Sequence, residues 1–308
     1  MRQSVSTPSR SMKKTPEPQM QHEPEPPFPK QHQAQPGLES ALDPSPKWQA
    51  PNYREAGKLE GKIALITGGD SGIGRSVAYL YAREGADVAI VYLPEEQEDA
   101  EVVREAVEAI ERKCLLLPGD LADPDFCKKA VEKTVKQFGR LDILVSNAAH
   151  QSRKTLAELT DEELERTYQV NVYAYFRLVR AALPHLKPGA AIIATSSETG
   201  LMGASRLPDY SSTKGAINAL TKTLATDFLE KGIRVNAVAP GPVWTPLNVA
   251  DPGADEEKVS TFGSQSPMGR PAQPEELAPA YVFLASDADS SFITGIVLQV
   301  MGGETTGG

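Results

Sequence analysis

Seven short apolar segments, the first beginning at residue 63, constrain the fold more than any other feature of the sequence. Segments of helical periodicity lie between them, at Arg75–Glu84, Glu95–Arg112, Pro124–Phe138 and Asp161–Leu186. Strands that are apolar on both faces and separated by helices form a parallel sheet covered on both sides. We therefore predict a single doubly wound α/β domain over residues 57–308. Its seven strands are expected at Ile63–Thr67, Asp87–Tyr92, Cys114–Pro118, Ile143–Asn147, Ala191–Ser196, Arg234–Ala239 and Ile296–Val300.

The composition changes sharply near residue 56. Residues 1–56 contain 11 of the 25 prolines and 7 glutamines, without apolar periodicity. Such a segment buries too little surface to offset its ordering entropy, so we predict a disordered or extended tail, most simply a solvated one. The stretch Pro26-Pro27-Phe28-Pro29 leaves open a short polyproline strip that docks elsewhere. The tail fits neither a secretory signal nor a mitochondrial transit peptide.

The charge balance excludes several classes of function. Lys and Arg number 32 against 41 Asp and Glu, a net charge of −9, which argues against nucleic acid or an anionic membrane as a partner. No apolar run approaches the roughly 20 residues of a membrane span. Two cysteines, Cys114 and Cys127, are too few for a disulfide framework and indicate a reducing compartment, so we expect a cytoplasmic protein. We predict no metal site.

The first predicted strand runs directly into a glycine-rich turn at residues 68–74 (GGDSGIG), and a helix begins at Arg75. Glycine lets backbone amides approach a pyrophosphate, and the helix N-terminus adds a favourable dipole. Between the first strand and the first helix of an α/β domain, such a turn indicates a dinucleotide site. The simpler interpretation, a tight turn with no ligand, stays open at this point.

Tyr210 and Lys214 lie four residues apart at the start of a predicted helix that runs to Leu229. This spacing places both side chains on one helix face. A nearby ammonium favours the phenolate and lowers the pKa of a tyrosine, which makes it usable as a general base near neutral pH. The pair alone is common by chance. Here it follows a strand that ends at Thr195-Ser196-Ser197, with the glycine-rich turn upstream.

Together these motifs resemble the short-chain dehydrogenase/reductase superfamily over about residues 58–303. They occur in the family's order, at Thr67–Gly74, Asp120, Asn147-Ala148-Ala149, Asn171, Ser197, Tyr210, Lys214 and Pro240-Gly241. The stretches Gly68–Arg75, Tyr210–Ala216, Ala239–Pro246 and Ser266–Pro279 are most similar to bacterial general-stress oxidoreductases, a group often labelled glucose/ribitol dehydrogenase or aldehyde reductase. Ser146 and Ala149 depart from the family's usual asparagine and glycine in a structural turn. The resemblance implies a Rossmann-type fold and an NAD(P)(H)-dependent oxidoreductase of alcohols and carbonyls.

The resemblance also implies a role for each catalytic residue. Tyr210 would donate or accept the proton on the substrate oxygen, and Ser197, rather than Ser196, would hydrogen-bond that oxygen. Lys214 would bind the nicotinamide ribose and lower the pKa of Tyr210. Asn171 would hold a water that links Lys214 to solvent, the alternative being an amide on the helix surface. The nicotinamide would carry the hydride.

The cofactor is expected to be NAD or NADP, and the preference between them stays open. The second predicted strand ends at Tyr92-Leu93-Pro94, with neither an acid for a ribose hydroxyl nor a base for a phosphate. Ser71 stands where NADP-preferring relatives often carry Arg or Lys. Asp70 would repel a phosphate unless it points away or binds a ribose hydroxyl. Asp120 would contact adenine, or is a loop aspartate or a cap for the helix at Pro124. The predicted cofactor-binding residues are Gly68, Asp70, Ser71, Gly72, Ile73, Gly74, Tyr92, Asp120, Leu121, Asn147, Ala148, Tyr210, Lys214, Pro240, Gly241, Val243 and Thr245.

Substrate contacts are expected from three segments: His150-Gln151, Glu198–Asp209 and Thr245–Met268, the last as a mobile lid. Ser197 and His150 are the predicted substrate-binding residues, although His150 is equally consistent with simple exposure. The lack of a long aromatic stripe favours a small carbonyl, polyol or sugar.

Two other functions compete with this one. A catalytically idle dinucleotide-binding scaffold could act through the tail, but it would have no use for Ser197, Tyr210, Lys214 and Asn171 together. Enoyl reductases of the same fold generally space the tyrosine and lysine more widely than four residues. The resemblance also implies a homotetramer built on the helices around Asn171 and Tyr210.

Overall fold

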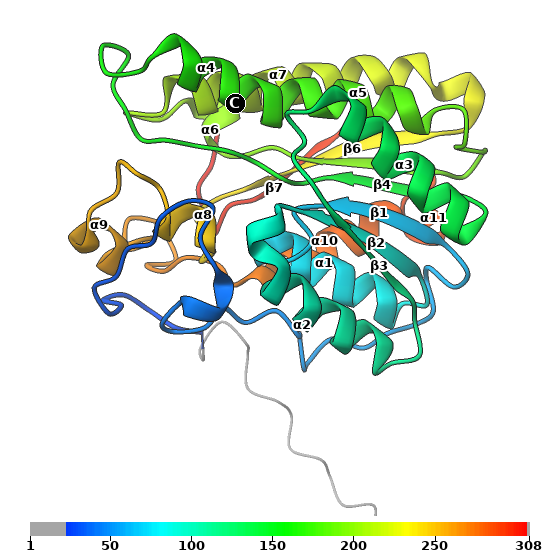
Figure 1. The fold of residues 1–308 in the computed structure, drawn as a ribbon, viewed down its shortest axis with the longest axis horizontal. Coiled ribbons are helices and arrows are strands. Elements are labelled where there is room, and N and C mark those ends of the chain that lie inside the picture. The colour runs from blue at the N-terminus through cyan, green and yellow to red at the C-terminus, as the bar shows by residue number, and fades with distance from the viewer. Residues whose placement is uncertain (1–22, 307–308) are drawn as a thin grey trace, which may run out of the picture.

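A computed structural model describes residues 23–306 of the chain. Seven parallel strands form one sheet of order β3-β2-β1-β4-β5-β6-β7 (Figure 1). The order reverses between β1 and β4, and in open α/β sheets ligands bind at such a point, beyond the carboxyl ends of the strands. The strands are β1 (Ile63–Thr67), β2 (Asp87–Tyr92), β3 (Cys114–Pro118), β4 (Ile143–Ser146), β5 (Ala191–Thr195), β6 (Arg234–Pro240) and β7 (Val297–Val300).

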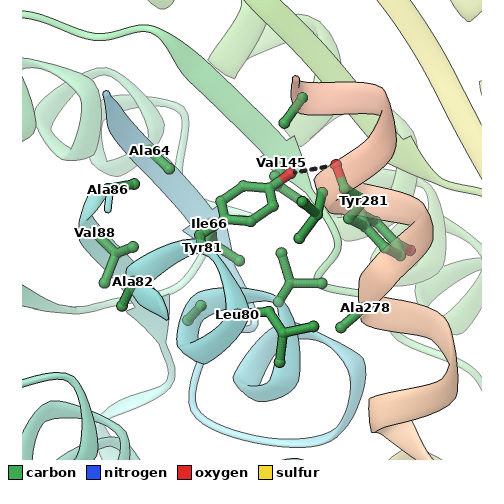
Figure 2. Close-up of a cluster of buried hydrophobic side chains, with 14 of the residues drawn as sticks. Ala64, Ile66, Leu80, Tyr81, Ala82, Ala86, Val88, Val145, Ala278 and Tyr281 are labelled. Carbon is green, nitrogen blue, oxygen red and sulfur yellow. Dashed lines mark hydrogen bonds between the residues drawn. The ribbon is translucent and has the colours of Figure 1, made fainter. Parts of the chain in front are cut away.

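Helices cover both faces of the sheet, as the sequence predicts. One face carries α1 (Gly72–Arg83), α2 (Gln97–Glu108) and α10 (Pro274–Ala285), and the other carries α3 (Pro124–Phe138), α5 (Ala174–Ala182) and α7 (Pro208–Asp227). In the first layer Tyr81 and Tyr281 are fully buried, and the Tyr81 hydroxyl donates to the Tyr281 carbonyl at 3.1 Å (Figure 2). The predicted fold class is therefore confirmed.

The prediction of one continuous helix over Asp161–Leu186 is wrong, because a π-helical turn interrupts it. Helix α4 (Asp161–Tyr168) passes through a π-helical turn at Gln169–Tyr173 before α5 begins at Ala174. A π turn adds a residue to one helical turn and is often found at functional sites. It leaves Asn171 buried rather than on the helix surface.

Short elements complete the architecture. They are α6 (Thr199–Met202), α8 (Pro246–Val249), α9 (Glu256–Ser260), α11 (Asp287–Ser290), and the 3₁₀ turns η2 (Glu39–Ala41), η3 (Pro94–Glu96) and η5 (Leu229–Lys231). Within residues 23–306, no helix is both long and apolar enough to cross a membrane.

Residues 23–56 correct the prediction of a solvated tail; residues 1–22 lie outside the described residues. This segment, the N-terminal strap, is mostly extended and runs past α8 and α9 to the ends of α1 and α2 (Figure 1). Phe28 and Leu42 are buried in a small apolar cluster with Trp244, Val249 and Val259. The sequence gives no periodic signal for such a segment because its partners are scattered through the chain. The docked alternative for Pro26-Pro27-Phe28-Pro29 is the one that the structure shows.

Candidate active site

A cavity of about 580 Å³ opens beyond the carboxyl ends of the strands. It gathers nearly all of the predicted site residues, from the glycine-rich turn, from the ends of β2 to β6 and from α7. The predicted residues in its wall are Gly68, Asp70, Ser71, Gly72, Ile73, Tyr92, Asp120, Leu121, Asn147, Ala148, His150, Ser197, Tyr210, Lys214, Pro240, Gly241, Val243 and Thr245. Gly74 and Asn171 are not in the wall and lie behind it.

The glycine-rich turn is held against the end of β4. Thr67 Oγ1 accepts hydrogen bonds from the amides of Asn147 and Ala148 at 2.9 and 3.0 Å, and Asn147 Nδ2 donates back to the Thr67 and Gly68 carbonyls. A Cβ on Gly74 would lie 1.8 Å from the Gly68 carbonyl oxygen, so only glycine fits there. These contacts fix the turn before any ligand arrives.

Tyr210, Lys214 and Ser197 converge on one wall of the cavity. Lys214 is 1% exposed; its Nζ donates to the Thr195 carbonyl at 2.8 Å and lies 5.2 Å from the centre of the Tyr210 ring. The Ser197 Oγ accepts hydrogen bonds from the backbone amide and the hydroxyl of Thr199 at 3.2 and 3.1 Å. The Ser197 hydroxyl, the Tyr210 phenol and the Lys214 amine therefore lie together in one buried corner of the cavity.

Burial dominates the proton affinities in this corner. It raises the pKa of Tyr210 well above its usual range, while the Ser197 hydroxyl lowers it in part. Burial also lowers the pKa of Lys214 to about 7. The lowered tyrosine pKa expected from the Tyr-x-x-x-Lys spacing is therefore wrong, because desolvation of the phenolate dominates and outweighs the lowering by Ser197 and Arg153.

Asn171 acts on the backbone beside the cavity. Its Oδ1 accepts from the His150 amide at 2.8 Å, and its Nδ2 donates to the His150 carbonyl and to Thr213 Oγ1 at 3.0 and 3.1 Å. Thr213 in turn donates to the Tyr210 carbonyl at 2.7 Å. The π turn thus ties the segment after β4 to the helix that carries Tyr210.

The sequence left open the roles of both Asp120 and His150, and the structure places both in the cavity wall. Asp120 does not cap α3, because Asp123 does so by accepting from the Asp125 amide. Instead Asp120 pairs with Arg166 at 2.7 Å in the cavity wall. His150 is half-buried in the same wall, and burial lowers its pKa, so its ring is neutral at pH 7.

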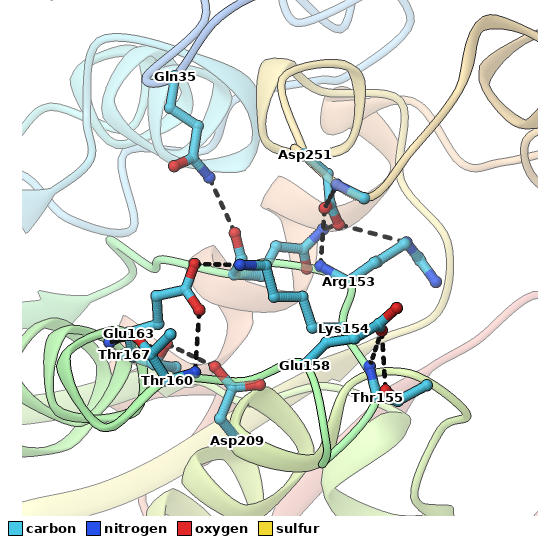
Figure 3. A network of polar contacts seen from close by, with 12 residues as sticks. Gln35, Arg153, Lys154, Thr155, Glu158, Thr160, Glu163, Thr167, Asp209 and Asp251 are labelled. Atoms are coloured by element: carbon cyan, nitrogen blue, oxygen red, sulfur yellow. Dashed lines mark hydrogen bonds and ion pairs between the residues drawn. The ribbon is translucent and has the colours of Figure 1, made fainter.

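The predicted lid is anchored rather than loose. Asp251 is completely buried: its carboxylate accepts from the Arg153 amide at 2.8 Å and from Gln151 Nε2 at 3.0 Å, and pairs with the Arg153 guanidinium (Figure 3). Residues Thr245, Pro246, Leu247, Asn248, Ala250 and Phe262 of this segment line the cavity.

Sequence reasoning missed one part of the wall, which comes from the N-terminal strap. Gln35 and Pro36 line the cavity, and Gln35 Nε2 donates to the Gln151 carbonyl at 2.8 Å (Figure 3). No local pattern around Gln35 could have indicated this, since its partner lies 116 residues away.

The cavity suits a dinucleotide. Ser71 precedes α1 but makes no side-chain cap to it, so no side chain of its own satisfies the first turn of that helix. One carboxylate oxygen of the buried Asp70, Oδ2, has no hydrogen-bond partner among the described residues. A glycine-rich turn that leads into a helix N-terminus suits a pyrophosphate, and an unpaired buried acceptor suits a ribose hydroxyl. These features define a nucleotide-dependent enzyme of the doubly wound class.

Comparison with known proteins names the family. Residues 68–305 match a family model described as Enoyl-(Acyl carrier protein) reductase. General stress protein 39 of Bacillus subtilis is 54% identical over 270 residues, covering 87% of this chain and 93% of that protein. Glucose and ribitol dehydrogenase of Daucus carota is 48% identical, covering 91% and 97%, and NADPH-dependent aldehyde reductase 1 of Arabidopsis thaliana is 47% identical, covering 89% and 96%.

Solved structures agree with the sequence comparisons. A short-chain dehydrogenase from Burkholderia cenocepacia, in complex with NADP, superposes with a TM-score of 0.74 at 34% identity, covering 80% of this chain and 98% of that one. A 3-ketoacyl-(acyl-carrier-protein) reductase from Brucella melitensis, complexed with NADH, gives 0.72 at the same identity and coverage. The chain belongs to the short-chain dehydrogenase/reductase family and is an NAD(P)-dependent oxidoreductase.

Proposed function

We propose that the protein interconverts a small alcohol, polyol or sugar hydroxyl and its aldehyde or ketone, with Tyr210 as general acid and base. The observation that carries this proposal is the convergence of Tyr210, Lys214 and Ser197 on one buried corner of the cavity. The relatives named for glucose, ribitol and aldehyde chemistry support the same class of substrate.

The residues of this chain handle one proton and one developing charge. In the reducing direction the Tyr210 hydroxyl donates its proton to the carbonyl oxygen, while the Ser197 hydroxyl hydrogen-bonds that oxygen as it gains negative charge. The glycine-rich turn and Lys214 would hold the nicotinamide dinucleotide, whose chemistry would be to supply or accept the hydride. Because burial raises the pKa of Tyr210, the phenol is protonated at neutral pH and ready to act as the acid.

The cavity wall near Tyr210 carries polar side chains beside apolar ones. The polar ones include His150 and Glu198, whereas Gln151, Arg153 and Asn248 already have partners within the protein. Imidazole and carboxyl groups hydrogen-bond hydroxyls. This favours a hydroxylated substrate over a steroid or a long acyl chain.

Turnover with a substrate panel tests the proposal. Oxidation of NADH and NADPH is followed with small aldehydes, ketones and sugars, and with an enoyl thioester. The proposal expects the small carbonyls to be reduced with the highest kcat/KM. Preferred reduction of the enoyl thioester would contradict it.

The adenosine end of the cavity favours NAD(H) over NADP(H). Asp70, Glu95 and Glu96 line this end, and the basic residues that line the cavity among the described residues are Arg153, Arg166 and Lys214, none of them near the tip of β2 in sequence. Asp70 and Glu95 oppose an additional phosphate, whereas burial raises the pKa of Glu96 to about 8, so that its carboxyl group is largely protonated at pH 7. The variant Glu95→Lys changes an exposed position and should tighten NADPH binding about tenfold, worth about 1.4 kcal/mol, without changing the Kd of NADH. Equal wild-type affinity for both cofactors would contradict the preference.

We also propose a cytoplasmic homotetramer. Phe176 on α5 is 45% exposed, and Phe292 and Ile296, which precede β7 in the sequence, are 101% and 39% exposed. Exposed apolar side chains of this kind suit contacts between subunits. Light scattering should give four times the mass of the chain, and Phe292→Ser should reduce it to that of a dimer. A wild-type monomer would contradict this assignment.

A further inference from the structure

The N-terminal strap is attached at both ends of the site. At one end, Phe28 packs on Trp244 with ring centres 4.3 Å apart, its amide donates to the Ser260 carbonyl, and its carbonyl accepts from Ser260 Oγ, both at 2.8 Å. Between the ends, His32 bonds to the Asp251 carbonyl at 3.2 Å. The strap therefore covers the segment after β6 that lines the substrate end.

At its other end the strap reaches the glycine-rich turn. Glu39 is 2% exposed; its Oε2 accepts from the Gly72 amide and its Oε1 pairs with Arg75 at 2.9 Å. Arg75 also pairs with Asp99 at 3.0 Å, and Asp99 accepts from the amides of Glu39 and Ser40. The carboxylate of Glu39 is thereby fixed from two directions.

Gly72 is the residue on which these contacts converge. Its φ of +51° favours glycine, and a Cβ there would lie 2.9 Å from Thr245 Cγ2. Gly72 is therefore held by Glu39 through its amide and lies against Thr245, in the segment after β6. Gly72 lines the cavity, whereas Glu39 does not.

We propose that the strap is a working part of the dinucleotide site and that Glu39 is its positioning residue. Glu39 holds the Gly72 amide and the Arg75 side chain, so that the first turn of α1 keeps the geometry that binds the pyrophosphate. The inference rests on the dinucleotide site of the proposed function but not on the identity of the substrate.

Comparisons with relatives fit a strap that is added to the common domain. The Burkholderia structure is covered over 98% of its length by only 80% of this chain. The glucose and ribitol dehydrogenase of Daucus carota aligns with 91% of this chain, more than residues 57–308 make up, so that alignment includes part of the strap.

The test is the Kd of NADH, measured by the fluorescence of the bound nucleotide without substrate. Glu39→Ala should raise this Kd at least tenfold, and Glu39→Gln, which keeps an acceptor for the Gly72 amide, should raise it less. Asp43→Asn removes an exposed carboxylate of the same strap and should leave the Kd unchanged. Amide hydrogen exchange in residues 68–75 of the cofactor-free protein should accelerate in Glu39→Ala and stay unchanged in Asp43→Asn.

Three results would overturn the inference. One is a wild-type NADH Kd in folded Glu39→Ala, or in Glu39→Gln if the alanine variant does not fold. Another is tighter binding in either variant, which would make Glu39 a competitor for the Gly72 amide. The third is unchanged exchange in residues 68–75. If wild-type protein bound NADH but reduced no carbonyl, the proposed function would fail while this inference could still hold.

Discussion

Two regions of the cavity wall are built in different ways. The strand-end region, from Thr67 to Gly74 and from Thr195 to Lys214, belongs to the αβ domain and places its groups by secondary structure. The N-terminal strap has one 3₁₀ turn among its described residues and is held by contacts such as Ser260 to Phe28, 232 positions apart. In the proposed mechanism the first region carries the reacting groups. The second region contacts the segments after β4 and β6 from outside the sheet and its helices.

The difference indicates how an enzyme of this fold can be altered without changing its chemistry. Loops at the carboxyl ends of strands carry function and tolerate additions, because the scaffold beneath them is rigid. A strap that crosses those loops can change how firmly they hold a cofactor or substrate while Tyr210 and Lys214 stay in place.

Replacement of Lys214 acts on the strand-end region and should have a larger effect than changes in the strap. Lys214→Met removes the buried amine beside the Tyr210 ring and, in the proposed mechanism, a donor to the nicotinamide ribose. We expect kcat to fall about 100-fold or more, within the usual range for general acid–base catalysis, and the Kd of NADH to rise. Lys222→Met alters an exposed lysine of the same helix and is the control. Equal kcat values in the two variants would remove Lys214 from the mechanism.

Replacement of Phe28 acts on the strap alone. Phe28→Ala removes a 5% exposed ring from its contact with Trp244, and loss of a buried phenylalanine costs about 3–5 kcal/mol. We expect the strap to open locally while the domain stays folded, so that the Phe28 amide exchanges faster and the KM for substrate rises, with kcat changed less. The matched control is Leu156→Ala, at a 78% exposed position. A KM equal to that of the control would show that the strap does not brace the substrate end.

The pH dependence of stability should give the smallest effect. Burial raises the pKa of Glu39 to about 7, although Arg75 and the Gly72 amide lower it in part; Asp99 and Asp70 raise it further. The folded state therefore keeps a proton that the unfolded chain has lost, so stability decreases as pH rises from about 4.5 through 7. Between pH 6 and 8 the wild type should lose about 1 kcal/mol of unfolding free energy relative to Glu39→Gln. The unfolding free energy of both proteins is measured by denaturant titration across this pH range. If it changed equally with pH in the wild type and in Glu39→Gln, the raised pKa of Glu39 would be contradicted.

The strand-end region is the part that the sequence predicts well. Three strands, β1, β2 and β3, begin and end at the predicted residues, and the other four differ by one residue at one end. Alternating elements and fixed motif spacings are local signals, so Tyr210, Lys214 and Ser197 could be brought together from the sequence. The interruption at Gln169–Tyr173 could not be predicted in this way, because the one residue that a π turn adds shifts the apolar periodicity too little to stand out in a single segment.

The position of the strap cannot be predicted from local sequence patterns. Its prolines and glutamines describe how it behaves alone, whereas its position depends on partners such as Trp244 and Arg75. A buried glutamate in a segment of low hydrophobicity gives no periodic pattern, and a single phenylalanine gives little more. The pKa of Tyr210 differs from the predicted direction for a related reason, since the spacing of Tyr210 and Lys214 indicates their proximity but not their burial.

Catalysis by Tyr210 is the central claim, and one comparison tests it most directly. Tyr210→Phe keeps the ring and removes the hydroxyl, so NADH should bind with the wild-type Kd. The rate of carbonyl reduction at saturating NADH, with the best substrate of the panel, should fall about 1000-fold. A variant that binds NADH normally and reduces the carbonyl at the wild-type rate would contradict the mechanism.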